Sequence, residues 1–192
     1  MAVEIEAKMS VPNLDVVRGR LRELGADGGG RTFETNTFFD TEDRSLLAAD
    51  EGLRLRRNHD EASGKDEHVI TYKGPRHHGA LKSRDEVEVT VGAYEDAVQL
   101  LERLGFVRML SFEKRRESWK FGGCKVELDE VPYLGTYVEV EGPSEATVLA
   151  VREQIGLSDR PVVKTSYIGM LMGYLQERGI QARRNVTFAD AV

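Results

Sequence analysis

Residues 3–9 read VEIEAKM, and apolar and charged side chains alternate along this stretch. Successive side chains of a β-strand point to opposite faces of the sheet, so Glu4, Glu6 and Lys8 would share one face. The apolar residues beside them would share the other face. A strand that turns one face to water can use neutral polar side chains there, whereas this strand carries only full charges.

The same alternation of apolar and fully charged residues returns in most of the later strand-like segments. The sequence predicts strands at Val3–Met9, Arg31–Asp40, Leu53–Asn58, His68–Lys73, Arg84–Val91, Phe106–Phe121, Cys124–Val131 and Thr136–Glu141. For one strand, a solvated face is the simplest interpretation. Repetition in so many strands, with both signs of charge, favours a closed barrel whose charged faces point inward.

Charges inside a barrel would need partners, because an isolated ion is very costly to bury. A polyanion bound together with metal ions would supply them, since basic side chains hold phosphates and carboxylates hold metals. The interior of the predicted barrel is therefore a candidate site for a phosphate-rich small molecule.

Four amphipathic helices are predicted, and their apolar stripes would cover the outside of the barrel. They span Asn13–Gly25, Tyr94–Gly105, about Ser144–Ile155 and about Ser166–Arg178. Asn13 is a candidate N-cap and Gly25 a candidate stop. Loops are expected at 27–30, 60–65 and 75–83. The predicted fold class is α+β, a closed antiparallel β-barrel with a charged interior and helices packed outside.

The order of elements repeats within the chain. The strand at EIEAK and the strand at EVEVT are each followed by an amphipathic helix ending in Leu-Gly and then by a long strand. This order predicts two pseudo-equivalent halves that close one sheet. We therefore expect one domain over residues 1–178, followed by a tail, 179–192, with little regular order.

The composition limits the classes of partner and compartment. The chain has 192 residues, 31% of them charged, and a formal net charge of −6, which disfavours a nucleic-acid partner. The single cysteine, Cys124, cannot form an intrachain disulfide, which is typical of a reducing compartment. The start, MAVEIEAK, lacks the pattern of a secretory signal, and no run approaches the roughly 18 apolar residues of a membrane span. We expect a cytoplasmic protein without a membrane partner.

In these motifs the sequence resembles the CYTH domain superfamily, also called the triphosphate tunnel metalloenzymes. EIEAK at residues 4–8 matches the E-x-E-x-K signature of that family, and further matching segments follow in order across about Val3–Leu171. These segments are FFDT, LRLR, TYKGP, SRDEVEV, EKRRESW, LDEVPYLGTYVEVEG and KTSY. The last two are most similar to class IV adenylyl cyclases of the CyaB type.

The resemblance implies a site of carboxylates that bind Mg²⁺ or Mn²⁺ and of basic side chains that bind phosphate. The implied metal ligands are Glu4, Glu6, Glu139 and Glu141, with Asp129 and Glu127 either holding a second metal or orienting the basic residues. The implied catalytic phosphate contacts are Lys8, Arg56, Lys73, Lys114 and Arg116, and the further substrate-binding residues are Arg54, Arg84 and Lys164. The residue chemistry agrees, because carboxylates two residues apart on a strand point the same way and their oxygens suit these ions.

Three functions fit this site. The first is a class IV adenylyl cyclase-like conversion of ATP to cyclic AMP and pyrophosphate. The second is hydrolysis of inorganic tripolyphosphate or of a nucleoside triphosphate. The third is a polyphosphate- or nucleotide-binding module without turnover, which would not need so many metal-binding carboxylates.

Two details of the resemblance bear on substrate and assembly. Phe38 stands where thiamine triphosphatases of this family carry a catalytic Tyr, which weakens the case for thiamine triphosphate. The resemblance to bacterial class IV cyclases suggests a homodimer.

Some chemically capable residues are not assigned to the site. His77 and His78 lie in a loop flanked by Gly and Pro, where we expect solvent exposure. Cys124 has no neighbouring His or second Cys in the sequence and is expected to be a small structural residue. Gly28–Gly30 lack the strand–loop–helix context of a phosphate loop and are expected to form a linker.

Overall fold

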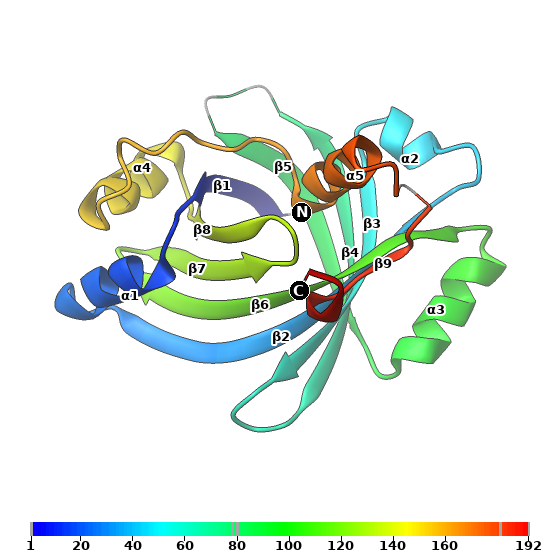
Figure 1. Ribbon diagram of the computed structural model, residues 1–192, viewed down its shortest axis with the longest axis horizontal. Coiled ribbons are helices and arrows are strands. Elements are labelled where there is room, and N and C mark those ends of the chain that lie inside the picture. Colours follow the sequence, from blue (N-terminus) through cyan, green and yellow to red (C-terminus); the bar gives the residue numbers. More distant parts are fainter. Residues whose placement is uncertain (1, 78, 80, 181, 192) are drawn as a thin grey trace.

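The structure, a computed structural model, describes residues 2–77, 79, 81–180 and 182–191. Its strands form a closed antiparallel barrel with helices outside, which confirms the predicted α+β class (Figure 1). The strands are β1 (Ala2–Ser10), β2 (Asp27–Asp40), β3 (Gly52–Asp60), β4 (Asp66–Arg76), β5 (Lys82–Val91), β6 (Val107–Phe121), β7 (Cys124–Val131), β8 (Gly135–Glu141) and β9 (Asn185–Val186).

The barrel is closed by the pairing of its two longest strands. The order of neighbours is β2-β3-β4-β5-β1-β8-β7-β6, and β6 pairs back onto β2. The short strand β9 pairs parallel to β6 outside this ring. If β1 and β5, β2 and β6, β3 and β7, and β4 and β8 exchange places, every strand keeps the same pair of neighbours around the barrel. This topological symmetry agrees with the two similar halves seen in the sequence.

The helices lie on the outer faces of the strands. They are α1 (Leu14–Glu23), α2 (Ser45–Ala48), α3 (Tyr94–Arg103), α4 (Glu145–Gln154), α5 (Tyr167–Glu177) and the 3₁₀ helix η1 (Phe188–Ala191). The four predicted helices are present, and Asn13 caps α1 by accepting a hydrogen bond from the Asp15 N–H group at 2.7 Å. Within the described residues, no helix is long and apolar enough to cross a membrane.

The apolar cores lie between the barrel and its helices. Helices α1 and α4 pack on the outer faces of β1, β7 and β8, where Ala7, Val138 and Val140 are fully buried. Helix α3 packs on β2 and β3, and α5 packs near β6 and β9. Most strands give their apolar side to these outer cores, so their charged side is left to face the barrel interior. On β5 the apolar side, with Val87 and Val89, is exposed.

Two segments differ from the expectation drawn from the sequence. Gly28–Gly30 do not form a linker, because β2 begins at Asp27 and Gly28 pairs with Trp119 of β6, with a register shift between Gly28 and Arg31. A methyl group at Gly29 would lie 2.1 Å from the Ser118 carbonyl oxygen, so the glycine allows close approach of two backbones. The C-terminal segment contains β9 and η1, whereas we expected little regular order there. Gln181 and Val192 of that segment, Met1, and His78 lie outside the described residues.

Candidate active site

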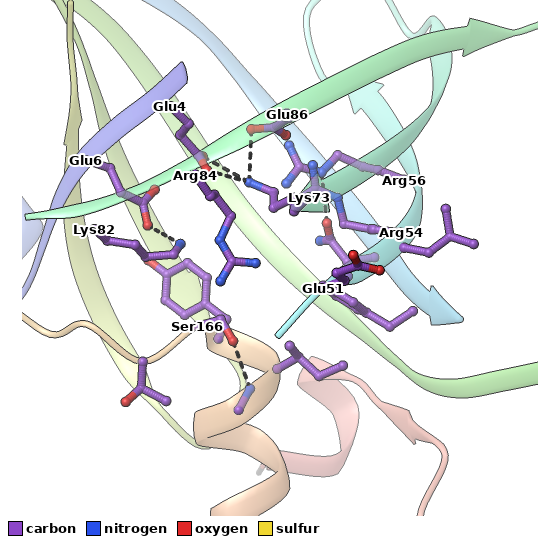
Figure 2. Close-up of a pocket in the computed structure, with 18 of the residues that line it drawn as sticks. Glu4, Glu6, Glu51, Arg54, Arg56, Lys73, Lys82, Arg84, Glu86 and Ser166 are labelled. Atoms are coloured by element: carbon purple, nitrogen blue, oxygen red, sulfur yellow. Dashed lines mark hydrogen bonds and ion pairs between the residues drawn. The ribbon is translucent and has the colours of Figure 1, made fainter. Parts of the chain in front are cut away.

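The barrel interior contains a cavity of about 510 Å³. It is lined by the inner faces of the strands and by the start of α5 (Figure 2). The sequence-predicted residues that line it are Glu4, Glu6, Lys8, Arg54, Arg56, Lys73, Arg84, Lys114, Arg116, Glu127, Glu139, Glu141 and Lys164. Residues far apart in the chain therefore meet in one place, as expected for a single site.

Acidic side chains of β1 and β8 lie side by side in this cavity. Glu6 and Glu141 are opposite each other in the register of the two strands, and Glu4 lies on the same face of β1. Burial, together with the charges of Glu4 and Glu127, raises the pKa of Glu141 to about 7. Carboxylates that repel one another in this way would be stabilised by a divalent cation.

The donor set fits the Mg²⁺ or Mn²⁺ expected from the sequence, because both ions prefer oxygen ligands. Lysines contact two of these carboxylates in the structure (Figure 2). Lys73 Nζ lies 2.9 Å from both carboxylate oxygens of Glu4, and Lys82 Nζ donates to Glu6 Oε1. Within the described residues, no group of three or more His, Cys, Asp or Glu side chains is already arranged around a point for a metal ion. Binding of an ion at Glu4 would require Lys73 to give up its contact, and binding at Glu6 Oε1 would require Lys82 to move.

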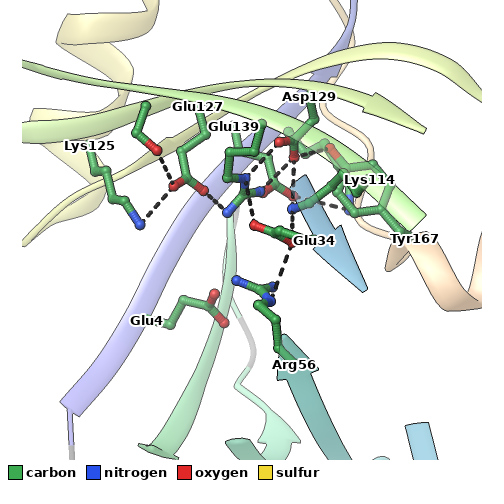
Figure 3. Close-up of polar contacts among 12 residues, drawn as sticks. Glu4, Glu34, Arg56, Lys114, Lys125, Glu127, Asp129, Glu139 and Tyr167 are labelled. Carbon is green, nitrogen blue, oxygen red and sulfur yellow. Dashed lines mark hydrogen bonds and ion pairs between the residues drawn. The ribbon is translucent and has the colours of Figure 1, made fainter. Parts of the chain in front are cut away.

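Arg116 lies at the centre of a buried ion-pair network. Figure 3 labels the acidic members of this network, Glu34, Glu127, Asp129 and Glu139. The Nε and Nη2 atoms of Arg116 each donate to Asp129 at 2.6 Å, Nη2 also donates to Glu139 Oε2 at 2.5 Å, and Nη1 contacts Glu127. Burial alone would lower the pKa of Arg116, but Asp129, Glu127 and Glu34 raise it well above its usual value. Arg116 is therefore a fixed positive charge in the wall of the cavity.

Glu34 of β2 joins this network, and its role was missed by the sequence analysis. Its carboxylate lies 3.1 Å from Lys114 Nζ, 3.3 Å from Arg56 Nε and 3.5 Å from Arg116 Nε. Burial would raise the pKa of Glu34, but these three cations lower it far below its usual value. The residue was missed because its inward-facing neighbours on β2, Asn36 and Phe38, are uncharged and gave no charged alternation.

The network separates two ends of the barrel interior. A second cavity of about 440 Å³ lies beyond it and shares Arg56, Arg116, Lys125 and Glu127 with the first cavity. The four shared side chains are ion-paired or hydrogen-bonded within the protein. The interior is therefore a tunnel whose two compartments meet at a wall of paired charges.

Asp129 is the one predicted site residue that does not line the larger cavity. Its side chain is fully buried and contacts Arg116, Lys114 and Tyr167. The sequence left two roles open for it, a second metal ligand or a positioner of basic residues. This burial behind Arg116 favours the positioning role.

Tyr167, at the start of α5, was also missed as a site residue, although it belongs to the KTSY motif. Its hydroxyl donates to Asp129 Oδ2 at 2.9 Å, and the Lys8 Nζ atom lies 4.2 Å from the centre of its ring. Burial and the charge of Asp129 raise the pKa of Tyr167 well above its usual value, so the phenol stays protonated. The ring and Glu139, 3.6 Å from Lys8 Nζ, together position that lysine.

Two arginines have donor groups without partners. The Nε atoms of Arg54 and Arg84 are buried and have no hydrogen-bond partner among the described residues. Burial and the nearby charge of Arg56 lower the pKa of Arg54 to about 10. Buried polar groups are normally hydrogen-bonded, so these side chains are suited to an anion in the cavity.

The same cavity also has an apolar wall. It is formed by Phe38, Leu53, Met109, Phe112, Ile168 and Met172, which come from β2, β3, β6 and α5. Phe38 and Phe112 stack with ring centres 6.0 Å apart. A ligand with both a polyanionic part and a flat apolar part would find suitable surroundings for each.

The remaining expectations concern the loop 75–83 and its neighbours. Strands β4 and β5 extend into this segment, so Lys82, placed in a loop by the sequence analysis, belongs to β5 and lines the cavity. Lys164 Nζ donates to the Gly79 carbonyl oxygen at 3.1 Å, which joins the segment before α5 to this loop. His77 is exposed and Cys124 is buried, both as expected.

Comparison with known proteins identifies relatives of the chain. A curated protein of Methanocaldococcus jannaschii, provisionally named an adenylate cyclase, is 31% identical over 139 residues, which are 72% of this chain and 76% of that protein. The structure of a Pyrococcus horikoshii protein is similar, with a TM-score of 0.78, 26% identity, and coverage of 89% of this chain and 99% of the other.

A Hippeastrum protein, provisionally named an adenylyl cyclase and described as having a dominant triphosphatase activity, shares the fold. Its TM-score is 0.58 at 20% identity, covering 94% of this chain and 89% of that chain. The CYTH domain family matches residues 2–167, which is most of the sequence. The match includes every strand of the barrel and the first residue of α5. This chain therefore belongs to the CYTH domain family.

Proposed function

We propose that this protein is a divalent-metal-dependent enzyme that binds ATP in the barrel and converts it to cyclic AMP and pyrophosphate. The observation that carries the proposal is a single cavity with paired carboxylates, arginines with unpartnered donors and an apolar wall. Membership of the CYTH domain family implies dependence on a divalent metal, and the choice of Mg²⁺ or Mn²⁺ is part of the proposal. The name of the Methanocaldococcus relative supports the same reaction class.

The basic side chains would bind the triphosphate. Arg54 and Arg84 have donors to offer, and Arg can hold a phosphate with two parallel hydrogen bonds. Lys73 would exchange its contact with Glu4 for a phosphate oxygen. The apolar wall that includes Phe38 and Phe112 would hold the nucleoside, which bare tripolyphosphate lacks.

In the proposed reaction the ribose 3′-hydroxyl attacks the α-phosphorus and pyrophosphate leaves. Negative charge grows on the leaving phosphates, and Arg56, Lys114 and Arg116 are already held in place to stabilise it. When bound at Glu4, Glu6 and their neighbours, the divalent ion would neutralise phosphate oxygens and polarise the attacked phosphoryl group. Positioning and charge neutralisation would supply most of the catalysis.

A second candidate function is hydrolysis of a triphosphate, and Glu141 favours it. This carboxylate forms no ion pair with the described residues, and its pKa of about 7 suits a group that accepts a proton from water near neutral pH. The dominant triphosphatase activity described for the Hippeastrum protein supports this alternative. The same binding residues would serve both reactions, because only the attacking oxygen and the attacked phosphorus differ.

A product assay distinguishes the two reactions. The enzyme is incubated with ATP or with tripolyphosphate, each with Mg²⁺ or Mn²⁺ at mildly alkaline pH, and the products are separated by chromatography. Cyclic AMP with pyrophosphate supports the cyclase. ADP with phosphate, or turnover of tripolyphosphate alone, supports the hydrolase and rejects the cyclase. Undiminished triphosphate binding in the presence of chelator, with no product, would instead identify a binding module.

A further inference from the structure

Protein cations neutralise the carboxylates proposed to bind the metal ion. Lys82 Nζ contacts Glu6 Oε1, and Lys73 Nζ lies 2.9 Å from both oxygens of Glu4 (Figure 2). Lys73 contacts both oxygens of Glu4, whereas Lys82 contacts one oxygen of Glu6. An ion that takes Glu6 Oε1, or both oxygens of Glu6, must displace Lys82 from that carboxylate.

The contact between Lys82 and Glu6 is fixed by the sheet and shielded from water. The two residues are direct partners in the register of β1 and β5, and their side chains are 9% and 7% exposed. Since the backbones are held by the barrel, only the side chain of Lys82 can move away. Separating a buried ion pair without replacing the lost partner is strongly unfavourable.

Lys82 and Lys73 differ in the number of carboxylates with which each forms an ion pair. Lys73 also contacts Glu86 Oε2 at 3.2 Å, so it keeps a carboxylate partner when it leaves Glu4. Among the described residues, Glu6 is the only carboxylate paired with Lys82. A displaced Lys82 loses that ion pair and keeps only the weaker influence of Glu4 and Glu139. A triphosphate in the same cavity can provide a new partner because Lys82 lines that cavity.

We propose that Lys82 is a built-in counterion of Glu6 that couples binding of the divalent ion to binding of the triphosphate. The ion displaces Lys82 from Glu6, and the triphosphate accepts the released ammonium group, so each ligand raises the affinity for the other. The inference rests on the proposed function for the metal ligand Glu6. It adds a role for a residue that neither binds the metal nor needs to touch the reacting atoms.

The test is a calorimetric titration of Mn²⁺ into the protein without triphosphate. Lys82→Met removes the charge and keeps the length of the side chain, so we expect Mn²⁺ affinity to rise by at least about fivefold, the lower range of coupling between sites. Lys82→Arg retains the charge and should bind Mn²⁺ like the parent protein. Lys120→Met, at an exposed lysine outside the cavity, is the matched control and should have no effect.

Folding of each variant is checked by circular dichroism, and Lys82→Gln replaces Lys82→Met if the latter does not fold. Equal or weaker Mn²⁺ affinity in the charge-removing variant, or no binding in any variant, would overturn the counterion role. The variant Glu6→Gln distinguishes failure of the counterion role of Lys82 from failure of the proposed metal site. If Glu6→Gln leaves Mn²⁺ affinity of the parent unchanged, the metal assignment itself is wrong. If it abolishes binding while Lys82→Met changes nothing, only the coupling role is wrong.

Discussion

At the residue scale, the chemistry of this barrel depends on carboxylates with opposite tasks. Glu34 is ionised because Arg56, Lys114 and Arg116 surround it and lower its pKa. Glu141 is only partly buried, and that burial together with acidic neighbours raises its pKa to about 7. Two glutamates in one tunnel thus differ in pKa because of the sign of the charges around them.

Glu6→Gln is predicted to abolish turnover of the triphosphate and to leave the fold intact. The amide keeps the shape of the side chain but loses the charge that would hold the divalent ion. Activity is measured at saturating substrate and limiting metal, with circular dichroism as the check on folding. Glu23→Gln, at an exposed position of α1, is the control and should retain full activity. Parent-level activity in Glu6→Gln would reject the metal assignment.

Glu34→Gln is predicted to lower the free energy of unfolding by roughly 3–5 kcal/mol, because it leaves three buried cations poorly compensated. The folded-state pKa of Glu34 is below its usual value of 4.5, so its stabilisation is complete above pH 4.5 and is lost as pH falls further. Urea unfolding between pH 7 and pH 3 measures both effects. The variant should show a shallower loss of stability with acid than the parent, and a parallel pH profile would contradict this role.

At the scale of elements, the seam between β2 and β6 closes the barrel. Twelve residue pairs join the two strands, with an irregularity between Gly28 and Arg31. The glycines permit close approach to β6 at the point where the Trp119 ring covers Gly28. A segment with the composition of a linker is therefore part of the barrel wall, because contact with a partner strand outweighs its weak intrinsic strand preference.

Gly29→Ala is predicted to destabilise the protein by roughly 1–3 kcal/mol, the usual cost of forcing extra volume into a packed site. The added methyl group would lie 2.1 Å from the Ser118 backbone oxygen, so the two strands must separate. The midpoint of urea unfolding measures the effect. Gly92→Ala is a matched control, since nothing lies within 4 Å of its added methyl group. Equal stability of both variants would show that the seam adapts without cost.

At the scale of the whole molecule, the barrel concentrates charges that a ligand would relieve. Tripolyphosphate with Mn²⁺ is predicted to raise the melting temperature, and at a concentration of 100 Kd the stabilisation would be about 2.7 kcal/mol. Scanning fluorimetry with and without ligand measures the shift. Arg54→Met should reduce that shift, because the Arg54 Nε donor is buried without a partner and is suited to phosphate. No shift with any triphosphate would reject the ligand assignment.

Local patterns in the sequence were sufficient for the fold class and for predicting which charged side chains face one interior. The strict alternation of strands such as residues 3–9 placed the charges on one face, and the helical stripes placed apolar cover on the other. Both patterns depend only on the periods of strand and helix, which any short segment reveals. The family signature then pointed to charged side chains on several strands that line one cavity.

Which charges meet was decided only by the tertiary structure. Lys82 contacts Glu6, and Glu34 contacts Lys114. Asp129 accepts hydrogen bonds from both Arg116 and Tyr167. Apart from the contact between Asp129 and Arg116, each of these contacts joins residues at least 30 positions apart in the chain. They depend on strand register and on closure of β2 onto β6. A shift of register by one residue would reverse the face of every side chain, and register is fixed by packing across the whole barrel. For that reason alternation revealed the charges, and only the closed barrel determined their partners.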